Sequence, residues 1–134
     1  MPSTTERTAR SVDFYSEIES LLKPYGKKLI ERTGTVKNKR DYHLWCGGPI
    51  EFKGRTYPEF SFASVIEQKG YVGLYLMAIS CNPAVKKQLS PALLLKLLKG
   101  KSRFYVKQLT PELKRDISSA LEASYDGYRK LGWI

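Results

Sequence analysis

The side chains of this 134-residue chain whose types and spacing could support nucleophilic catalysis are His43, Cys46 and Cys81. His43 is the only histidine, which excludes a metal site built on several histidines, and the two cysteines lack metal-site spacing. On a regular strand His43 and Cys46 point to opposite faces, so a Cys–His nucleophile pair would need a bulge between them. We therefore interpret His43 as a structural or pocket-lining residue and the thiols as ordinary reduced side chains.

An aromatic pocket on one face of a sheet is an alternative site in the same region. Such a pocket would combine aromatic side chains with one histidine and one carboxylate, namely Tyr42, His43, Trp45, Glu59 and Tyr75. A mainly aromatic lining with few polar groups is typical of a ligand site. The prediction requires Glu59 to lie on the same sheet face as the aromatic residues; otherwise Glu59 is a surface carboxylate.

Positive charge is distributed unevenly along the chain. Lys and Arg number 23 and Asp and Glu 13, which gives a net charge of +10. No acidic residue occurs between Glu67 and Glu112, and the basic residues that we predict to bind anions there are Lys86, Lys87, Lys99, Lys101, Arg103 and Lys107. A basic surface attracts polyanions and releases counterions on binding, so the predicted partner is nucleic acid, a smaller anionic ligand or an acidic protein. The alternative is that these side chains only solvate the surface.

The elements that must position these residues begin with a helical region. We expect a helix from Ser11, a plausible N-cap, that is kinked or restarted at Pro24 and ends at Gly34. From about residue 40 the apolar residues alternate with polar ones, which predicts strands joined by short turns as far as Ile79. The short spacings leave no room for helices between these strands and favour antiparallel pairing.

The alternation also predicts which side chains share a sheet face. We expect His43 and Trp45 on the sheet face opposite to Tyr42 and Cys46. In the next strands, we expect Phe60, Phe62 and Ile66 on one face and Ser61, Ala63 and Val65 on the other. Residues 71–79 are apolar on both faces, which predicts the most buried strand of the sheet.

The second half of the chain predicts a helix over 90–100, a strand over 103–107 and a last helix over 110–132. The complete order of elements predicts an α+β fold, in which an antiparallel sheet of about five strands has helices packed on one face. Residues 1–10 are polar and without apolar period, so we expect a flexible N-terminal tail. Residues 11–134 should form a single domain.

Three separated segments carry a resemblance to a known family. The segments are Gly70–Met77 (GYVGLYLM), Gly100–Lys107 (GKSRFYVK) and Tyr128–Ile134 (YRKLGWI), and they occur in this order. The chain resembles the YdhG-like family, a bacterial family of domains of unknown function, from about Phe14 to its last residue. The resemblance implies an α+β fold similar in arrangement to frataxin.

The same resemblance implies iron as the bound metal ion, because some YdhG-like proteins are described as frataxin-like iron chaperones. Iron would be held by carboxylates of the first helix, where Asp13 and Glu17 are four residues apart and share a face. The alternative is that these carboxylates belong to an ordinary solvated helix face.

We therefore expect a small binding protein rather than an enzyme. The ligand implied by the resemblance is iron, and the alternative is a module that binds nucleic acid or another anionic ligand through its basic surface. An enzyme that acts in an aromatic pocket around His43 is the third hypothesis. No segment has the roughly 20 apolar residues of a membrane span, and the first residues lack an apolar signal core, so we expect a cytoplasmic location and no membrane partner.

Overall fold

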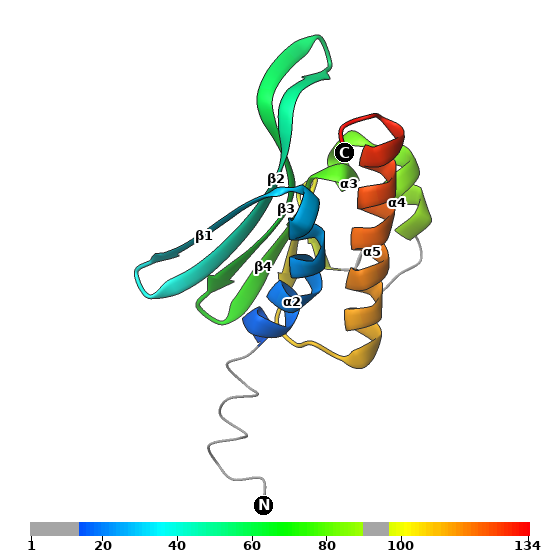
Figure 1. The fold of residues 1–134 in the computed structure, drawn as a ribbon. Coiled ribbons are helices and arrows are strands. Elements are labelled where there is room, and N and C mark those ends of the chain that lie inside the picture. The colour runs from blue at the N-terminus through cyan, green and yellow to red at the C-terminus, as the bar shows by residue number, and fades with distance from the viewer. Residues whose placement is uncertain (1–13, 90–96) are drawn as a thin grey trace, which may run out of the picture.

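The computed structural model describes residues 14–89 and 97–134, which form an antiparallel sheet with helices on one side (Figure 1). The helices are α2 (Phe14–Leu22), the short 3-10 helix η1 (Lys23–Lys28), α3 (Met77–Cys81), α4 (Pro83–Leu89) and α5 (Pro111–Lys130). The strands are β1 (Ile30–Val36), β2 (Lys39–Phe52), β3 (Arg55–Gln68), β4 (Tyr71–Leu76), β5 (Leu98–Lys99) and β6 (Arg103–Val106). The tail expected at residues 1–10 lies outside the described residues.

The described strands form one six-stranded sheet in the order β1-β2-β3-β4-β6-β5, and each neighbouring pair is antiparallel. The fold class predicted from the sequence, α+β with an antiparallel sheet and helices on one face, is confirmed, with six strands in place of about five. Strands β2 and β3 have 14 residues each, and their hairpin reaches beyond the helical layer in Figure 1.

Strand β1 corrects the prediction of a helix that continues to Gly34. The helical region ends with η1, which has Pro24 in its first turn, and residues 30–36 then pair with β2. All seven residues of β1 are exposed, so this edge strand buries no apolar face and its sequence lacks the alternation that reveals a strand. The local signal that favours the extended backbone is its set of β-branched residues, Ile30, Thr33, Thr35 and Val36.

Two other boundaries differ from the prediction. The buried strand expected over residues 71–79 ends at Leu76, and Met77–Cys81 is a short helix. Both Ala78 and Ile79 are buried in that helix, which explains why the segment is apolar although it is not a strand. The helix expected over 90–100 falls partly outside the described residues, and Leu98–Lys99 is strand β5.

The hydrophobic core lies between one face of the sheet and the helices. From the sheet, Tyr42, Leu44, Phe62 and Leu74 are almost completely buried, and from α2 and α5 the buried residues are Tyr15, Ile18, Leu22, Leu113, Ile117, Ala120, Leu121 and Tyr128. The Phe62 ring lies 5.6 to 6.0 Å from the rings of Tyr25, Tyr125 and Tyr128. Burial of a side chain of this size contributes about 1.5–3 kcal/mol to the stability of the folded state. These contacts hold the helical layer against one face of the sheet.

A bulge in β3 changes which residues face the helices. Trp45 pairs with Ser61, but Leu44 pairs with Ala63, so one residue of β3, Phe62, has no partner on β2. Both Phe62 and Ala63 are buried on the core side, and the alternation resumes one step out of phase. The expected grouping of Phe62 with Ile66 is therefore wrong, because a strict period of two does not hold across a bulge.

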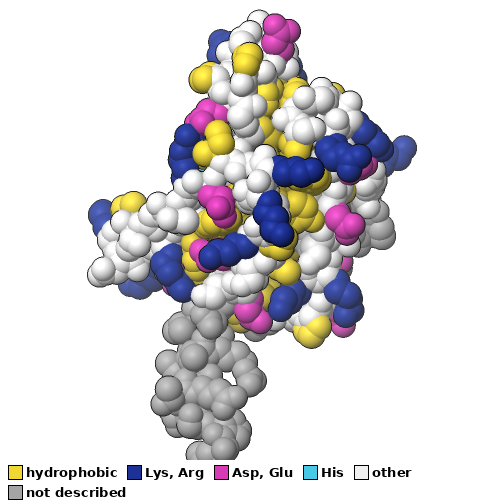
Figure 2. All heavy atoms as spheres, viewed as in Figure 1, with side chains coloured by type: hydrophobic (Ala, Val, Ile, Leu, Met, Phe, Trp, Pro, Cys, Tyr) yellow, Lys and Arg dark blue, Asp and Glu magenta, His cyan; other side chains and the backbone are white. Residues whose placement is uncertain are grey.

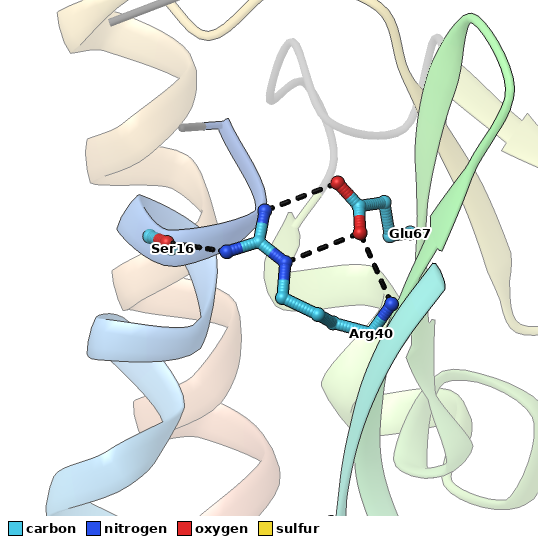
Figure 3. Close-up of polar contacts among 3 residues, drawn as sticks. All are labelled: Ser16, Arg40 and Glu67. Carbon is cyan, nitrogen blue, oxygen red and sulfur yellow. Dashed lines mark hydrogen bonds and ion pairs between the residues drawn. The ribbon is translucent and has the colours of Figure 1, made fainter. Parts of the chain in front are cut away.

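Arg40 joins strands β2 and β3 to helix α2 (Figure 3). Its guanidinium donates hydrogen bonds to both carboxylate oxygens of Glu67, at 3.1 and 3.0 Å, and one to the Ser16 hydroxyl, at 3.1 Å. The Arg40 backbone N–H donates a further hydrogen bond to Glu67 Oε1 at 3.0 Å. The guanidinium also lies 4.5 Å from the centre of the Tyr15 ring. This network fixes the start of α2 against the sheet.

Candidate functional site: the open face of the sheet

The face of the sheet opposite the helices is the strongest candidate for a binding surface. No described helix packs on this face, which we call the open face (Figure 1). Side chains of the open face alternate with core side chains along each strand, and they include Arg32, Asp41, His43, Trp45, Glu59, Ser64, Ile66, Tyr71, Tyr75, Lys99, Arg103 and Tyr105. Several of these aromatic and basic side chains are partly exposed where a core would bury them.

One row of side chains crosses the entire open face. Each residue in the row is the direct pairing partner of the next, and the order is Arg32, His43, Ser64, Tyr75, Arg103 and Lys99. Directly paired residues of an antiparallel sheet lie on the same face. At about 4.8 Å per strand, the row spans about 24 Å. We call these six residues the cross-strand row.

A chain of hydrogen bonds occupies the middle of the cross-strand row. His43 Nε2 lies 3.1 Å from Asp41 Oδ1, and His43 Nδ1 lies 2.8 Å from the Ser64 hydroxyl oxygen. The His43 side chain is 28% exposed, whereas Ser64 is 7% exposed. Both nitrogens of the only histidine are therefore engaged by neighbours on the open face.

Arg32 is neutralised at one end of the row. Its guanidinium forms a bidentate ion pair with Glu59, with N···O distances of 2.6 and 2.8 Å, and lies 5.7 Å from the centre of the Trp45 ring. Hydrogen bonding from Arg32 lowers the pKa of the Glu59 carboxyl, and the same contact raises the pKa of Arg32. This end of the row presents an aromatic ring with little net charge.

Around the other end of the cross-strand row, the open face carries aromatic and positively charged side chains. The rings of Tyr71 and Tyr105 stack with their centres 4.5 Å apart, and the Arg103 guanidinium lies 5.3 Å from the centre of the Tyr105 ring. A hydrogen bond with Tyr75 is the main cause that raises the pKa of Arg103. The pKa of Tyr71 is also raised, first by desolvation and then by the Tyr105 phenol. No carboxylate pairs with Arg103 within the described part of the chain.

Gly73 makes room for the Tyr75 ring on the sheet surface. A Cβ atom at Gly73 would lie 3.3 Å from Tyr75 Cε1 and 3.9 Å from its hydroxyl oxygen. The ring therefore leans along β4 over the glycine instead of standing away from the sheet. This position brings the Tyr75 hydroxyl toward β6, where Tyr105 pairs with Gly73.

The structure brings together most, but not all, of the predicted pocket residues. His43, Trp45, Glu59 and Tyr75 share the open face, because the bulge in β3 leaves Glu59 on that side. Tyr42 lies on the opposite, core face: it is 1% exposed and its hydroxyl donates a hydrogen bond to Glu31. The predicted set thus forms a surface without Tyr42 and not an enclosed pocket.

The predicted anion-binding residues fall into separate places. Lys99 and Arg103 lie in the cross-strand row, and Lys101 lies in the turn between β5 and β6. Lys107 follows β6 and lines a cavity of about 600 Å³ together with Lys99 and Tyr105. In contrast, Lys86 and Lys87 lie on α4, in the helical layer. Figure 2 also shows Lys and Arg interspersed with Asp and Glu over the visible face, so positive charge is not confined to one patch there.

The residues predicted to hold iron are only partly described. Asp13 lies outside the described residues, and Glu17 on α2 forms an ion pair with Lys114 at 3.6 Å. Within residues 14–89 and 97–134, no three or more His, Cys, Asp or Glu side chains are grouped so that they could hold a metal ion. Iron binding stays a prediction.

The cysteines do not contribute to the open face. Cys46 is completely buried on the core face, opposite to His43, and Cys81 is partly buried with its sulfur 3.9 Å from the Tyr128 hydroxyl oxygen. Desolvation by burial, followed by the nearby Cys81, raises the pKa of the Cys46 thiol to about 12. A thiol with this pKa is a poor nucleophile at neutral pH.

Comparison with known proteins adds no assignment: no family model, curated protein or solved structure matches this chain. The YdhG-like resemblance therefore stays a prediction. None of the helices in the described ranges is both long and apolar enough to cross a membrane.

Three polar residues around His43 on the open face are not among the predicted site residues. The predicted helical region that ends at Gly34 includes Arg32, and the predicted sites include neither Asp41 nor Ser64. The missing information was the strand register, because His43 meets Ser64 and Arg32 only through pairing between strands. The spacing of Asp41 and His43, two residues apart on one strand, is the one local signal that predicts a shared face.

Proposed function

We propose that this protein binds single-stranded nucleic acid on the open face of its sheet. The observation that carries the proposal is the stacked pair Tyr71 and Tyr105 beside Arg103, on a face that no described helix covers. Single-stranded nucleic acids are bound by aromatic side chains that stack on bases and by basic side chains that contact phosphates.

The charge of the chain supports the same partner. The net charge is +10, and the β4–β6–β5 end of the open face carries Lys99 and Arg103 without a paired carboxylate among the described residues. Such an end supplies the phosphate contacts, while Trp45, Tyr75 and Tyr105 are partly exposed aromatic side chains on the same face. The major groove of duplex DNA admits a single helix or a two-stranded ribbon, whereas the open face belongs to a six-stranded sheet. An unpaired strand is therefore the better match to this broad surface.

The test is fluorescence anisotropy with a labelled 12-nucleotide single strand, measured over a series of salt concentrations. We expect Arg103→Ala to weaken binding several-fold and to reduce the slope of log K against log salt by about 1. Arg129→Ala is the matched control, because it removes the same charge from an exposed position of helix α5, on the other side of the sheet.

The aromatic contribution is tested separately. Tyr105→Leu removes the ring that stacks on Tyr71 without changing the charge, and we expect a loss on the order of ten-fold, which corresponds to about 1–3 kcal/mol per stacked base. Equal losses in Arg103→Ala and Arg129→Ala, together with unchanged binding in Tyr105→Leu, would show that the affinity comes from net charge alone and would overturn the proposal.

A further inference from the structure

We propose that His43 and Ser64 form a proton-controlled phosphate contact at the centre of the cross-strand row. The inference deepens the proposed function and rests on it: the ligand group is a phosphodiester of the bound single strand. It is carried by the hydrogen-bonded chain of Asp41, His43 and Ser64, whose two N···O distances are 3.1 and 2.8 Å.

The chemistry of Asp41 fixes the direction of these hydrogen bonds. A carboxylate only accepts, so His43 Nε2 must carry the hydrogen that it donates to Asp41 Oδ1. A neutral imidazole has a single N–H, which leaves Nδ1 as an acceptor. The Ser64 hydroxyl therefore donates its hydrogen to Nδ1, and that hydrogen is not available to a ligand.

Protonation of His43 reverses the second hydrogen bond. Both imidazole nitrogens then carry a hydrogen, so Nδ1 donates to the Ser64 oxygen. The Ser64 hydroxyl hydrogen is released and can be donated to a phosphate oxygen that lies on the sheet between His43 and Tyr75. Protonation also places a positive charge in the middle of the face, and histidine is the side chain that ordinarily changes charge between about pH 5 and 8.

The charged groups around His43 determine the sign of the effect. Its own strand supplies Asp41 and, at the next open-face position, Lys39; β1 supplies Arg32 and β3 supplies Glu59. β4 supplies the neutral phenol of Tyr75, and Arg103 lies one strand further. Arg32 is paired with Glu59, and no Lys or Arg of the described residues forms an ion pair with Asp41, so the Asp41 carboxylate lacks an ion-pair partner while His43 is neutral. Protonated His43 compensates Asp41, so a phosphate is bound more tightly as the pH falls.

The effect of His43 protonation can be measured separately from other histidines and from the ligand. His43 is the only histidine, and the phosphodiesters of an oligonucleotide without terminal phosphates do not titrate between pH 5.5 and 7. We would measure anisotropy with a 12-nucleotide strand of this kind at pH 5.5 and at pH 7 and at constant ionic strength. We expect the wild-type affinity to be higher at pH 5.5 by on the order of five-fold.

Three variants separate the steps. His43→Gln has a polar side chain that cannot be protonated in this pH range, so we expect the pH dependence of binding to disappear. Ser64→Ala keeps the imidazole charge but removes the hydroxyl, so it should retain only part of the gain. Asp41→Asn removes the uncompensated carboxylate and should bind more tightly than wild type at pH 7. Circular dichroism of each variant establishes that it is folded.

A measurement on the wild-type protein tests the hydrogen-bond directions without any substitution. A long-range ¹H–¹⁵N spectrum at neutral pH should show the hydrogen of neutral His43 on Nε2, and the opposite tautomer would overturn the inference. Titration with dimethyl phosphate, which has a diester and no base, should shift His43 and Ser64 signals more at pH 5.5 than at pH 7. Absence of these shifts would overturn the phosphate contact.

The two proposals fail in different ways. Absence of oligonucleotide binding at every pH would overturn the proposed function. Binding that does not change between pH 5.5 and pH 7, or a pH dependence that persists in His43→Gln, would overturn only the role of His43.

Discussion

The hydroxyl of Tyr128 donates a hydrogen bond to the backbone carbonyl of Ser61, with an O···O distance of 2.8 Å. Tyr128 lies on α5 and is completely buried, and Ser61 lies next to the bulge in β3. The bond therefore links the helical layer to the place where the sheet alternation changes phase. That change of phase puts both Glu59 and Ser64 on the open face.

Replacement of Tyr128 by Phe tests the value of this link. The substitution removes this hydrogen bond from the partly buried Ser61 carbonyl, so we expect the free energy of unfolding to fall by about 1–2 kcal/mol in urea denaturation. Tyr125→Phe is the matched control on the same helix, because the Tyr125 hydroxyl makes no hydrogen bond within the described residues. Equal stability of the two variants would contradict the assigned role.

The Arg40–Glu67 pair should make the free energy of unfolding decrease at acidic pH. Hydrogen bonding from Arg40 lowers the pKa of the Glu67 carboxyl below its usual value of 4.5 in the folded protein. The stabilisation is therefore complete above pH 4.5 and is lost as the pH falls through the lower, folded pKa. We expect Glu67→Gln to cost about 1 kcal/mol at pH 7, since both side chains are partly exposed, and less below pH 4.

Urea denaturation of wild type and Glu67→Gln at several pH values between about 3 and 7 measures this difference. Glu51→Gln serves as the control, because the exposed Glu51 has no ion pair in the part of the chain that the structure describes. A stability difference for Glu67→Gln that stays constant over the whole range would show that the carboxylate charge is not involved.

Substitution of Gly73 by Ala should weaken ligand binding without unfolding the protein. The added Cβ would lie 3.3 Å from the Tyr75 ring and would force it to move by a few tenths of an ångström. Since Tyr75 contacts Arg103, we expect a loss of affinity of about two- to five-fold, a fraction of the cost of one stacked base. Gly47→Ala is the control, because its nearest neighbour would be Ile30 Cδ1 at an ordinary 3.8 Å. Identical affinities of the two variants would be the contrary result.

The Cys46 thiol should react much more slowly in the folded protein than in the unfolded protein. Burial raises the pKa of Cys46 to about 12, and Cys81, whose pKa is also raised by burial, is partly exposed. With iodoacetamide at pH 8, we expect Cys46 of a Cys81→Ser variant to react at least about a hundred-fold more slowly in the native state than in urea. Mass spectrometry measures the rate of modification. Fast modification of Cys46 in the native protein would mean that the core around it opens readily.

Local patterns in the sequence predict much of the fold. The alternation through Tyr42, His43 and Leu44 assigns the faces of β2 correctly, and the N-cap at Thr110 predicts the start of α5, where the Thr110 hydroxyl accepts a hydrogen bond from the Leu113 N–H. Local patterns do not predict strand β1, because an exposed edge strand needs no apolar face. They also do not predict the bulge at Phe62, because the bulge depends on pairing with β2.

The candidate site is less predictable for the same physical reason. Trp45 and Tyr75 are identified from their types and direction, whereas Ser64 becomes relevant only when strand register places it against His43. The separation of Lys86 from Arg103 is a second example. Both belong to one basic stretch of the sequence, but α4 turns the first toward the helical layer and β6 places the second on the open face.

The cross-strand row takes a single residue from each of the six described strands, and those residues come from positions 32 to 103. No fragment with fewer strands contains the whole row. A ligand that spans it would recognise only the completely assembled sheet and would leave partly unfolded chains unbound. Its binding energy would then add directly to the stability of the native state, so that saturation with ligand would raise the melting temperature of the entire domain.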